Sequence, residues 1–245
     1  MNDQTKITSL AVLYAGLLGV CYLEGFWNIF NINVFQYADL MDVIKATVLP
    51  LLLILFAVAL GFLSSLSFHI VTPDPVPLPV PPPLTIKIFI FIRTYKGIIF
   101  TLWVSAGIVA YFTLSPPQKW EAMSIFSFPF GLMVANTKFI TSISNRIGFR
   151  GVLGVVFVSL PFVSLEYGST AAINITRGLE KYSVDVSGLT FPKTMHPPVS
   201  LEYVGFVGSS FFLYDPSSKG LVVIKQSDST VLSLIPNPAA PHTSE

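Results

Sequence analysis

The sequence predicts an all-α membrane bundle of about five transmembrane helices, followed by a small antiparallel β-rich extramembrane domain. Residues 46–66 carry no charge, and this length matches the about 20 apolar residues that a helix needs to cross a bilayer. Similar runs occur near the N-terminus and three more times before residue 167. Only 11% of the residues are charged, against about 25% in soluble domains. Together with a mean hydropathy of +0.69, this excludes an ordinary soluble globular protein.

Five segments are long and apolar enough to be predicted as spans. They are residues 7–23, 44–66, 97–114, 122–140 and 151–165. We expect the first to be a retained helix rather than a signal peptide, because no small-residue cleavage site follows it. Pro50 lies early in the second span, where a first turn tolerates proline. The fourth contains Pro129, and the fifth is the shortest, with Pro161 in its second half and Glu166 at its end.

The basic residues predict the orientation of these spans, because Lys and Arg gather in cytoplasmic loops. With the N-terminus inside, seven basic residues lie inside and two lie in the short outer loops. The inside set is Lys6, Lys87, Arg93, Lys96, Lys138, Arg146 and Arg150, and the outer pair is Lys45 and Lys119. Arg177 and Lys181 weaken this contrast. An odd number of spans makes the C-terminal domain periplasmic, whereas a re-entrant fifth segment returns it to the cytoplasm.

A proline tract separates the first two spans from the others. Seven of the eleven residues 73–83 are proline, which favours an extended polyproline II conformation. We interpret the tract as a stiff spacer, with a docking strip for a proline-binding groove as the alternative. After it, basic side chains either extend the third span inward or lie at lipid headgroups. The candidate headgroup contacts here and in the later loop are Lys87, Arg93, Lys96, Arg146 and Arg150.

Short β-rich runs mark the C-terminal part, at residues 199–207, 210–214, 221–225 and 230–234. The turn sequence Asp-Pro-Ser-Ser-Lys-Gly at 215–220 predicts an antiparallel meander. About 55 residues form a marginal core, so we expect this domain to pack on the helices or on a partner. The predicted organisation is a hairpin at 1–66, a cytoplasmic linker at 67–96, spans at 97–167, a β-rich domain at 183–236 and a disordered tail at 237–245.

The first outer loop is unusually aromatic. Its candidate interfacial residues are Phe26, Trp27, Phe30, Asn33, Tyr37, Asp39 and Asp42. Aromatic rings suit the lipid headgroup region. Asp39 is placed to cap a helix that begins near residue 38, and Asp42 lies on the same helical face. The two carboxylates therefore predict a cap and anchor, with a paired-carboxylate cation site as the alternative.

Few polar residues lie within the predicted spans, although such residues are functional candidates by default. Asn136 and Lys138 are the candidates late in the fourth span. We expect Lys138 to reach the inner interface and Asn136 to bond another helix. No protease, hydrolase or phosphate-loop motif occurs, so the sequence predicts a non-enzymatic protein without cofactor or metal. A net charge of +1 argues against nucleic acid as a partner.

Two stretches resemble an uncharacterised family of bacterial multi-span inner-membrane proteins. The first is Phe30-x-Ile32-Asn33-x3-Tyr37-x4-Asp42, which enters the second span. The second comprises Val204-Gly205, Phe211-Phe212-Leu213-Tyr214-Asp215 and Leu221-Val222-Val223-Ile224. The chain differs from the family at Asn31, where glycine is usual, and at Lys225, where proline is usual. The resemblance implies a bacterial inner-membrane location and a small β unit after the helices, and it implies no reaction.

These observations lead to two functional hypotheses. The first is a partner-binding component of a membrane complex, or an immunity or defence-type factor. Its partners are the lipid bilayer and another protein or a second copy of the chain. The second is a small oligomeric channel or transporter, in which Asn136, Lys138 and the Asp39/Asp42 pair line a path. A membrane enzyme ranks last, because no nucleophile–base pair is recognisable.

Overall fold

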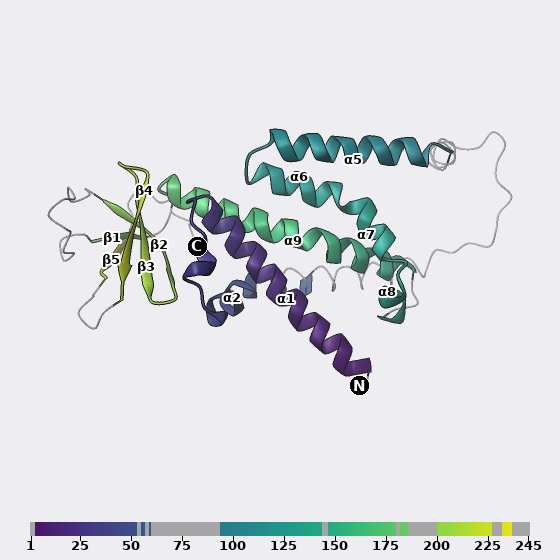
Figure 1. Ribbon diagram of the computed structural model, residues 1–245, viewed down its shortest axis with the longest axis horizontal. Coiled ribbons are helices and arrows are strands. Elements are labelled where there is room, and N and C mark those ends of the chain that lie inside the picture. Colours follow the sequence, from purple (N-terminus) through teal and green to yellow (C-terminus); the bar gives the residue numbers. More distant parts are fainter. Residues whose placement is uncertain are drawn as a thin grey trace. The chain divides into compact units, whose positions relative to one another are not determined.

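The computed structural model is mostly helical and ends in one small antiparallel sheet (Figure 1). It describes residues 3–52, 55–56, 59, 94–143, 147–179, 182–185, 200–226 and 232–236. The chain divides into two compact units, one formed by Met1–Pro50 with Ser164–Glu245 and the other by Leu51–Val163. The proline tract and nearly half of the second predicted span, including its end, lie outside the described residues.

The first unit contains the N-terminal helices, the second part of a long helix and the sheet. Its helical elements are α1 (Asp3–Asn28), the 3-10 helix η1 (Val34–Gln36), α2 (Leu40–Ala46) and the end of α9 (Ile147–Thr176). Its strands are β1 (Tyr182–Val184), β2 (Leu201–Val207), β3 (Ser210–Asp215), β4 (Gly220–Lys225) and β5 (Leu234–Pro236). The order β4-β3-β2-β1-β5 makes β2, β3 and β4 the predicted meander.

Strand β1 was not predicted from the sequence. It pairs antiparallel with both β2 and β5, through Ser183 opposite Glu202 and opposite Ile235. A three-residue strand carries too little alternation to be recognised, and long-range pairing alone defines it. One face of the sheet turns toward α1 and α9, and a smaller core of Val184, Leu201 and Leu213 lies on the other face.

The second unit contains a helical hairpin and the first part of α9. Its helices are α5 (Lys96–Thr113), α6 (Gln118–Phe126), α7 (Phe128–Val134) and α8 (Lys138–Ile143). Helix α5 matches the third predicted span almost residue for residue. In Figure 1, α5 and α6 run side by side in opposite directions, and α7 continues from α6 after a bend. The Trp103 indole fastens the pair by donating to the Phe126 carbonyl at 3.1 Å.

The fourth predicted span is wrong as a single helix. The segment 122–140 is divided among α6, α7 and α8, with breaks near Ser127 and Thr137. Pro129 has no backbone N–H to donate, and the hydroxyls of Ser127 and Thr137 donate to carbonyls three residues earlier, at 2.6 and 2.7 Å. The fifth predicted span was too short, because α9 continues through Pro161 and Glu166 to Thr176.

Two helices in the described part of the chain are long and apolar enough to cross a membrane. They are Thr8–Asn28 within α1 and Phe149–Thr176 within α9. Helix α5 contributes a shorter apolar stretch, Gly97–Thr113. By helix length and composition, the described residues are compatible with a membrane location, and they give two candidate spans rather than five.

Small residues make close helix contacts in the second unit. A side chain on Gly131 would overlap the backbone of Val155, and a side chain on Gly154 would overlap Gly131 and Ala135. Gly131 and Ala135 therefore mark the place where α7 meets α9. Backbone approach of this kind is typical of helices packed without a hydrophobic driving force.

Candidate functional site

The aromatic first loop packs against the β-sheet. The Trp27 side chain is 2% exposed, and its ring lies 4.7 Å from that of the fully buried Phe212. Tyr37 approaches the same Phe212 ring edge-on at 5.3 Å, and Phe30 lies 5.8 Å from Tyr214. We call the buried set the loop–sheet cluster; it comprises Leu23, Trp27, Val34, Ile175, Val204, Val207, Phe212 and Tyr214. It joins α1, η1 and α9 to β2 and β3.

The path of the loop follows from the way α1 ends. Asn31 has φ = +56°, and the N–H of Ile32 donates to the Trp27 carbonyl at 3.2 Å. With the bond from the N–H of Asn31 to the Asn28 carbonyl, this is a Schellman motif, which needs a left-handed residue. Asparagine tolerates that conformation better than most residues other than glycine, which suits it to this position.

Asn33 and Asp39 start the next two helices. The Asn33 side chain accepts from the N–H of Phe35 and caps η1. Asp39 is the N-cap of α2, and it forms a reciprocal capping box with Asp42, in which each carboxylate accepts the backbone N–H of the other residue at 2.9 and 3.2 Å. The predicted capping role of Asp39 is thus confirmed.

Asp42 also binds the sheet directly. Its carboxylate is 8% exposed and accepts the N–H of Gly208 at 2.8 Å, while Lys45 lies 3.7 Å from its other oxygen. Gly208 is the first residue of the tight β2–β3 turn and has φ = +59°. A side chain there would overlap the Tyr37 carbonyl. The Asp42 carboxylate therefore holds the loop to the turn.

This arrangement divides the predicted interfacial residues into two groups. Trp27 lies in the protein core, so the prediction that it meets lipid headgroups is wrong for this residue. Phe26 and Phe30 are partly buried against the loop–sheet cluster. Tyr37 remains 42% exposed, and its neighbours Phe35, Leu40 and Met41 form an exposed apolar rim beside it. The rim, rather than the whole loop, remains free for an outside contact.

The predicted intramembrane polar residues lie at a helix break. The Asn136 amide donates within its own segment, to the Leu132 carbonyl at 3.2 Å, rather than to another helix. Lys138 is the first residue of α8 and is exposed. Neither lies in the middle of a long helix, since the fourth span is broken here.

The candidate headgroup residues are only partly described. Lys96 is the first residue of α5, and Arg150 is half-buried in the first turns of α9, where its Nε lacks a hydrogen-bond partner among the described residues. Lys87, Arg93 and Arg146 lie outside the described residues. No group of three or more His, Cys, Asp or Glu side chains suited to a metal occurs in the ranges that the structure describes.

The turn between β3 and β4 is fixed by Asp215. Its carboxylate accepts from the Ser217 hydroxyl at 2.6 Å, from the Ser217 N–H at 2.9 Å and from the Ser218 hydroxyl at 2.7 Å. The hydrogen bond from the Ser217 side chain, assisted by Ser218, lowers the pKa of Asp215. The carboxylate is therefore retained as an anion that closes the turn.

Sequence reasoning did not connect the loop with the sheet. Phe212 and Tyr214 lie in a predicted strand and in the resemblance, Gly208 lies between two predicted strands, and no local pattern joins them to Trp27. In comparisons with known proteins, no family model, curated protein or solved structure matches this chain.

Proposed function

We propose that this chain is an inner-membrane protein of about five spans, with its N-terminus in the cytoplasm, which displays the β-sheet in the periplasm as a partner-binding unit. One observation carries the proposal. The C-terminal end of α1, the N-terminal end of α2 and the C-terminal end of α9 all meet the sheet within the first unit. If α1 and α9 both cross the membrane, three helix ends on one sheet support a topology in which these two helices end on the same side.

That topology agrees with an odd number of spans. If α1 leaves the cytoplasm, the chain must cross an even number of times between α2 and the end of α9. Four crossings, through the second span, α5, the broken α6–α8 segment and α9, meet this condition. Further support is the apolar surface of α1 and α5, where Leu13 is 73% exposed and Phe112 is 80% exposed, as expected of lipid-facing side chains. The family resemblance implies the same location.

Single-cysteine labelling tests this topology. In a Cys21→Ser background, Gln226→Cys places a thiol just after β4, and Thr5→Cys places one near the N-terminus. In intact spheroplasts, a membrane-impermeant maleimide should label position 226 and leave position 5 unlabelled until the membrane is permeabilised. Equal labelling of both positions before permeabilisation would contradict an odd number of spans.

The partner-binding role rests on strand β4. It is the outermost strand at one end of the described sheet, and no described strand pairs with its outer side. The N–H of Gln226 donates to the Ser209 carbonyl at 2.8 Å. In an antiparallel pair such bonds recur at every second residue, so the even-numbered residues of β4 direct their backbone groups toward β3. The odd-numbered residues therefore direct their backbone N–H and C=O groups outward; they are Leu221, Val223 and Lys225. This edge suits the addition of an extended segment of a partner protein.

Val223→Pro should block such a strand without disturbing β4, because it removes an outward N–H and leaves the bonds to β3 intact. A photoreactive amino acid at position 225 should form an adduct with the partner in cells. We expect Val223→Pro to reduce this adduct at least about ten-fold, since an unmatched buried carbonyl costs about 1–3 kcal/mol. The fraction of cross-linked protein is measured by immunoblot.

Val223→Thr is the matched control, because it changes the side chain and keeps the N–H. It should retain the adduct, and both variants should unfold at the temperature of the parent protein. An adduct that persists in a folded Val223→Pro protein would exclude strand addition at β4 and leave the membrane topology untouched.

A further inference from the structure

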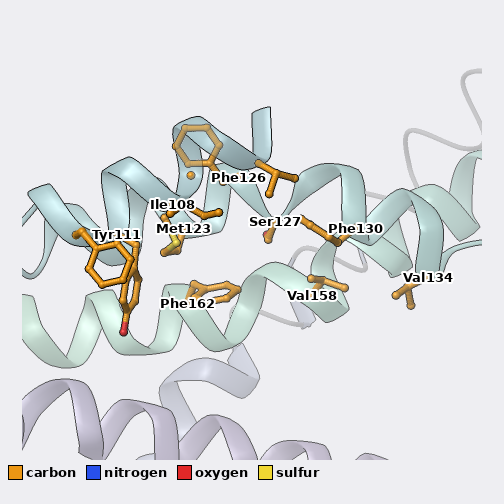
Figure 2. A pocket seen from close by; sticks show the side chains of 12 residues that line it. Ile108, Tyr111, Met123, Phe126, Ser127, Phe130, Val134, Val158 and Phe162 are labelled. Carbon is orange, nitrogen blue, oxygen red and sulfur yellow. The ribbon is translucent and has the colours of Figure 1, made fainter. Parts of the chain in front are cut away.

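An apolar cavity of about 500 Å³ lies within the second unit (Figure 2). Its walls come from α5, α6, α7 and the first part of α9. The lining includes Tyr111, Met123, Phe126, Phe130, Val158 and Phe162. This volume falls in the range of about 300–1,000 Å³ that is typical of small-molecule sites.

The lining offers nothing to a polar ligand. Ser127 is its one hydroxyl residue besides Tyr111, and the Ser127 hydroxyl already donates to the Ser124 carbonyl at 2.6 Å. Aromatic rings, branched aliphatic side chains and the Met123 thioether form the remaining surface. A hydrocarbon chain is the chemistry that matches such walls.

A charged side chain lies next to one of the residues that line the cavity. Tyr111 lines the cavity, and the Lys119 ammonium lies 4.0 Å from the centre of its ring. The same ammonium lies 5.0 Å from the Trp120 ring, which packs edge-on against Tyr111. The Trp120 Nε1 is buried and has no hydrogen-bond partner among the described groups. A cation thus lies beside the apolar cavity, over the ring of one of its lining residues.

We propose that the cavity holds one acyl chain of a membrane phospholipid, with the anionic phosphate of its headgroup at Lys119. The ammonium supplies the charge that a phosphate requires. Lys119 and Trp120 follow the α5–α6 turn, and Lys, Trp and Tyr are typical of the membrane interface. The proposal rests on membrane placement and is independent of partner binding.

Photolabelling of the full chain in liposomes tests the site. The probes are phosphatidylglycerol and diacylglycerol that carry the same diazirine acyl chain, and mass spectrometry locates the adducts. We expect adducts on peptides containing Met123, Phe126 or Phe130, with more from phosphatidylglycerol. Lys119→Gln should lower labelling by phosphatidylglycerol about five-fold, the effect of one lysine near an anionic headgroup, and leave labelling by diacylglycerol unchanged.

Val158→Phe should fill the cavity and reduce labelling by both probes. Val109→Phe, on an exposed part of α5 outside the lining, and Lys138→Gln, at an exposed lysine outside the site, are the matched controls and should change neither. Equal labelling by the two probes in the parent protein, or full labelling in a folded Val158→Phe variant, would overturn the proposal. Flotation of the liposomes reports separately whether the chain is membrane-embedded.

Discussion

Phe212→Ala is expected to lower the free energy of unfolding of the first unit by about 3–5 kcal/mol. The Phe212 ring is fully buried, and it contacts Trp27 from α1 and Tyr37 from the first loop. Its removal leaves a cavity between segments that are far apart in the sequence, so no single element can relax to fill it. Denaturant unfolding of the purified chain in detergent, followed by tryptophan fluorescence and by circular dichroism, measures the loss.

Phe211→Ala is the matched control for this prediction. Phe211 is the neighbouring residue on β3, and successive strand residues point to opposite faces. Its half-buried ring packs at 4.8 Å against Phe206, on the face away from the loop. We expect it to cost less than half as much. Similar losses for the two variants would show that the sheet is not fastened through the face that carries Phe212.

The loop–sheet cluster explains what the sequence could and could not predict about the site. The aromatic residues were recognised as unusual, and the capping role of Asp39 followed from local spacing alone. The contact of Trp27 with the sheet could not be predicted in this way, because large amphipathic rings suit lipid headgroups and protein cores equally well. Only the position of Phe212, distant in the sequence, decides between these environments.

The helices show the same division between local and long-range causes. Apolar length located α1 and α5 well, and turn chemistry located β3 and β4. Two prolines, in contrast, have opposite outcomes: α7 begins beside Pro129, whereas α9 continues through Pro161. Each removes one backbone donor, so local sequence does not distinguish them. The environment does, because α9 is held on both sides of Pro161 by close contacts at Gly154 and Gly168.

Helix α1 crosses the second part of α9 at a pair of glycines. A side chain on Gly25 would overlap the Leu165 backbone, and one on Gly168 would overlap the Tyr22 carbonyl. The buried Ser169 hydroxyl lies 3.0 Å from the Gly25 carbonyl and 2.8 Å from the Leu165 carbonyl, which joins the two helices at the same point. At the crossing, positions 25 and 168 therefore have no room for any side chain larger than the hydrogen atom of glycine.

Gly25→Ala is accordingly expected to destabilise the first unit by at least about 2 kcal/mol. A methyl group facing a backbone carbonyl has no side chain to push aside, so the helices must separate; overpacking costs about 1–3 kcal/mol, and the strained Ser169 bond adds about 0.5–1.5 kcal/mol. Thermal unfolding in detergent measures the change. A disulfide between cysteines introduced at the crossing should also form more slowly in the variant.

Gly16→Ala provides the control within the same helix. No atom lies within 4 Å of the position that its methyl group would occupy. Gly16→Ala therefore only replaces glycine, which has a low helix propensity, by alanine, which has a high one. The free energy of unfolding should be unchanged or rise by about 0.5–1 kcal/mol. A loss of stability for Gly25→Ala and a gain for Gly16→Ala would separate the effect of helix propensity from the effect of close packing. A stabilising Gly25→Ala would show that α1 and α9 do not approach through these residues, and the sheet would then lose one of its two helical supports.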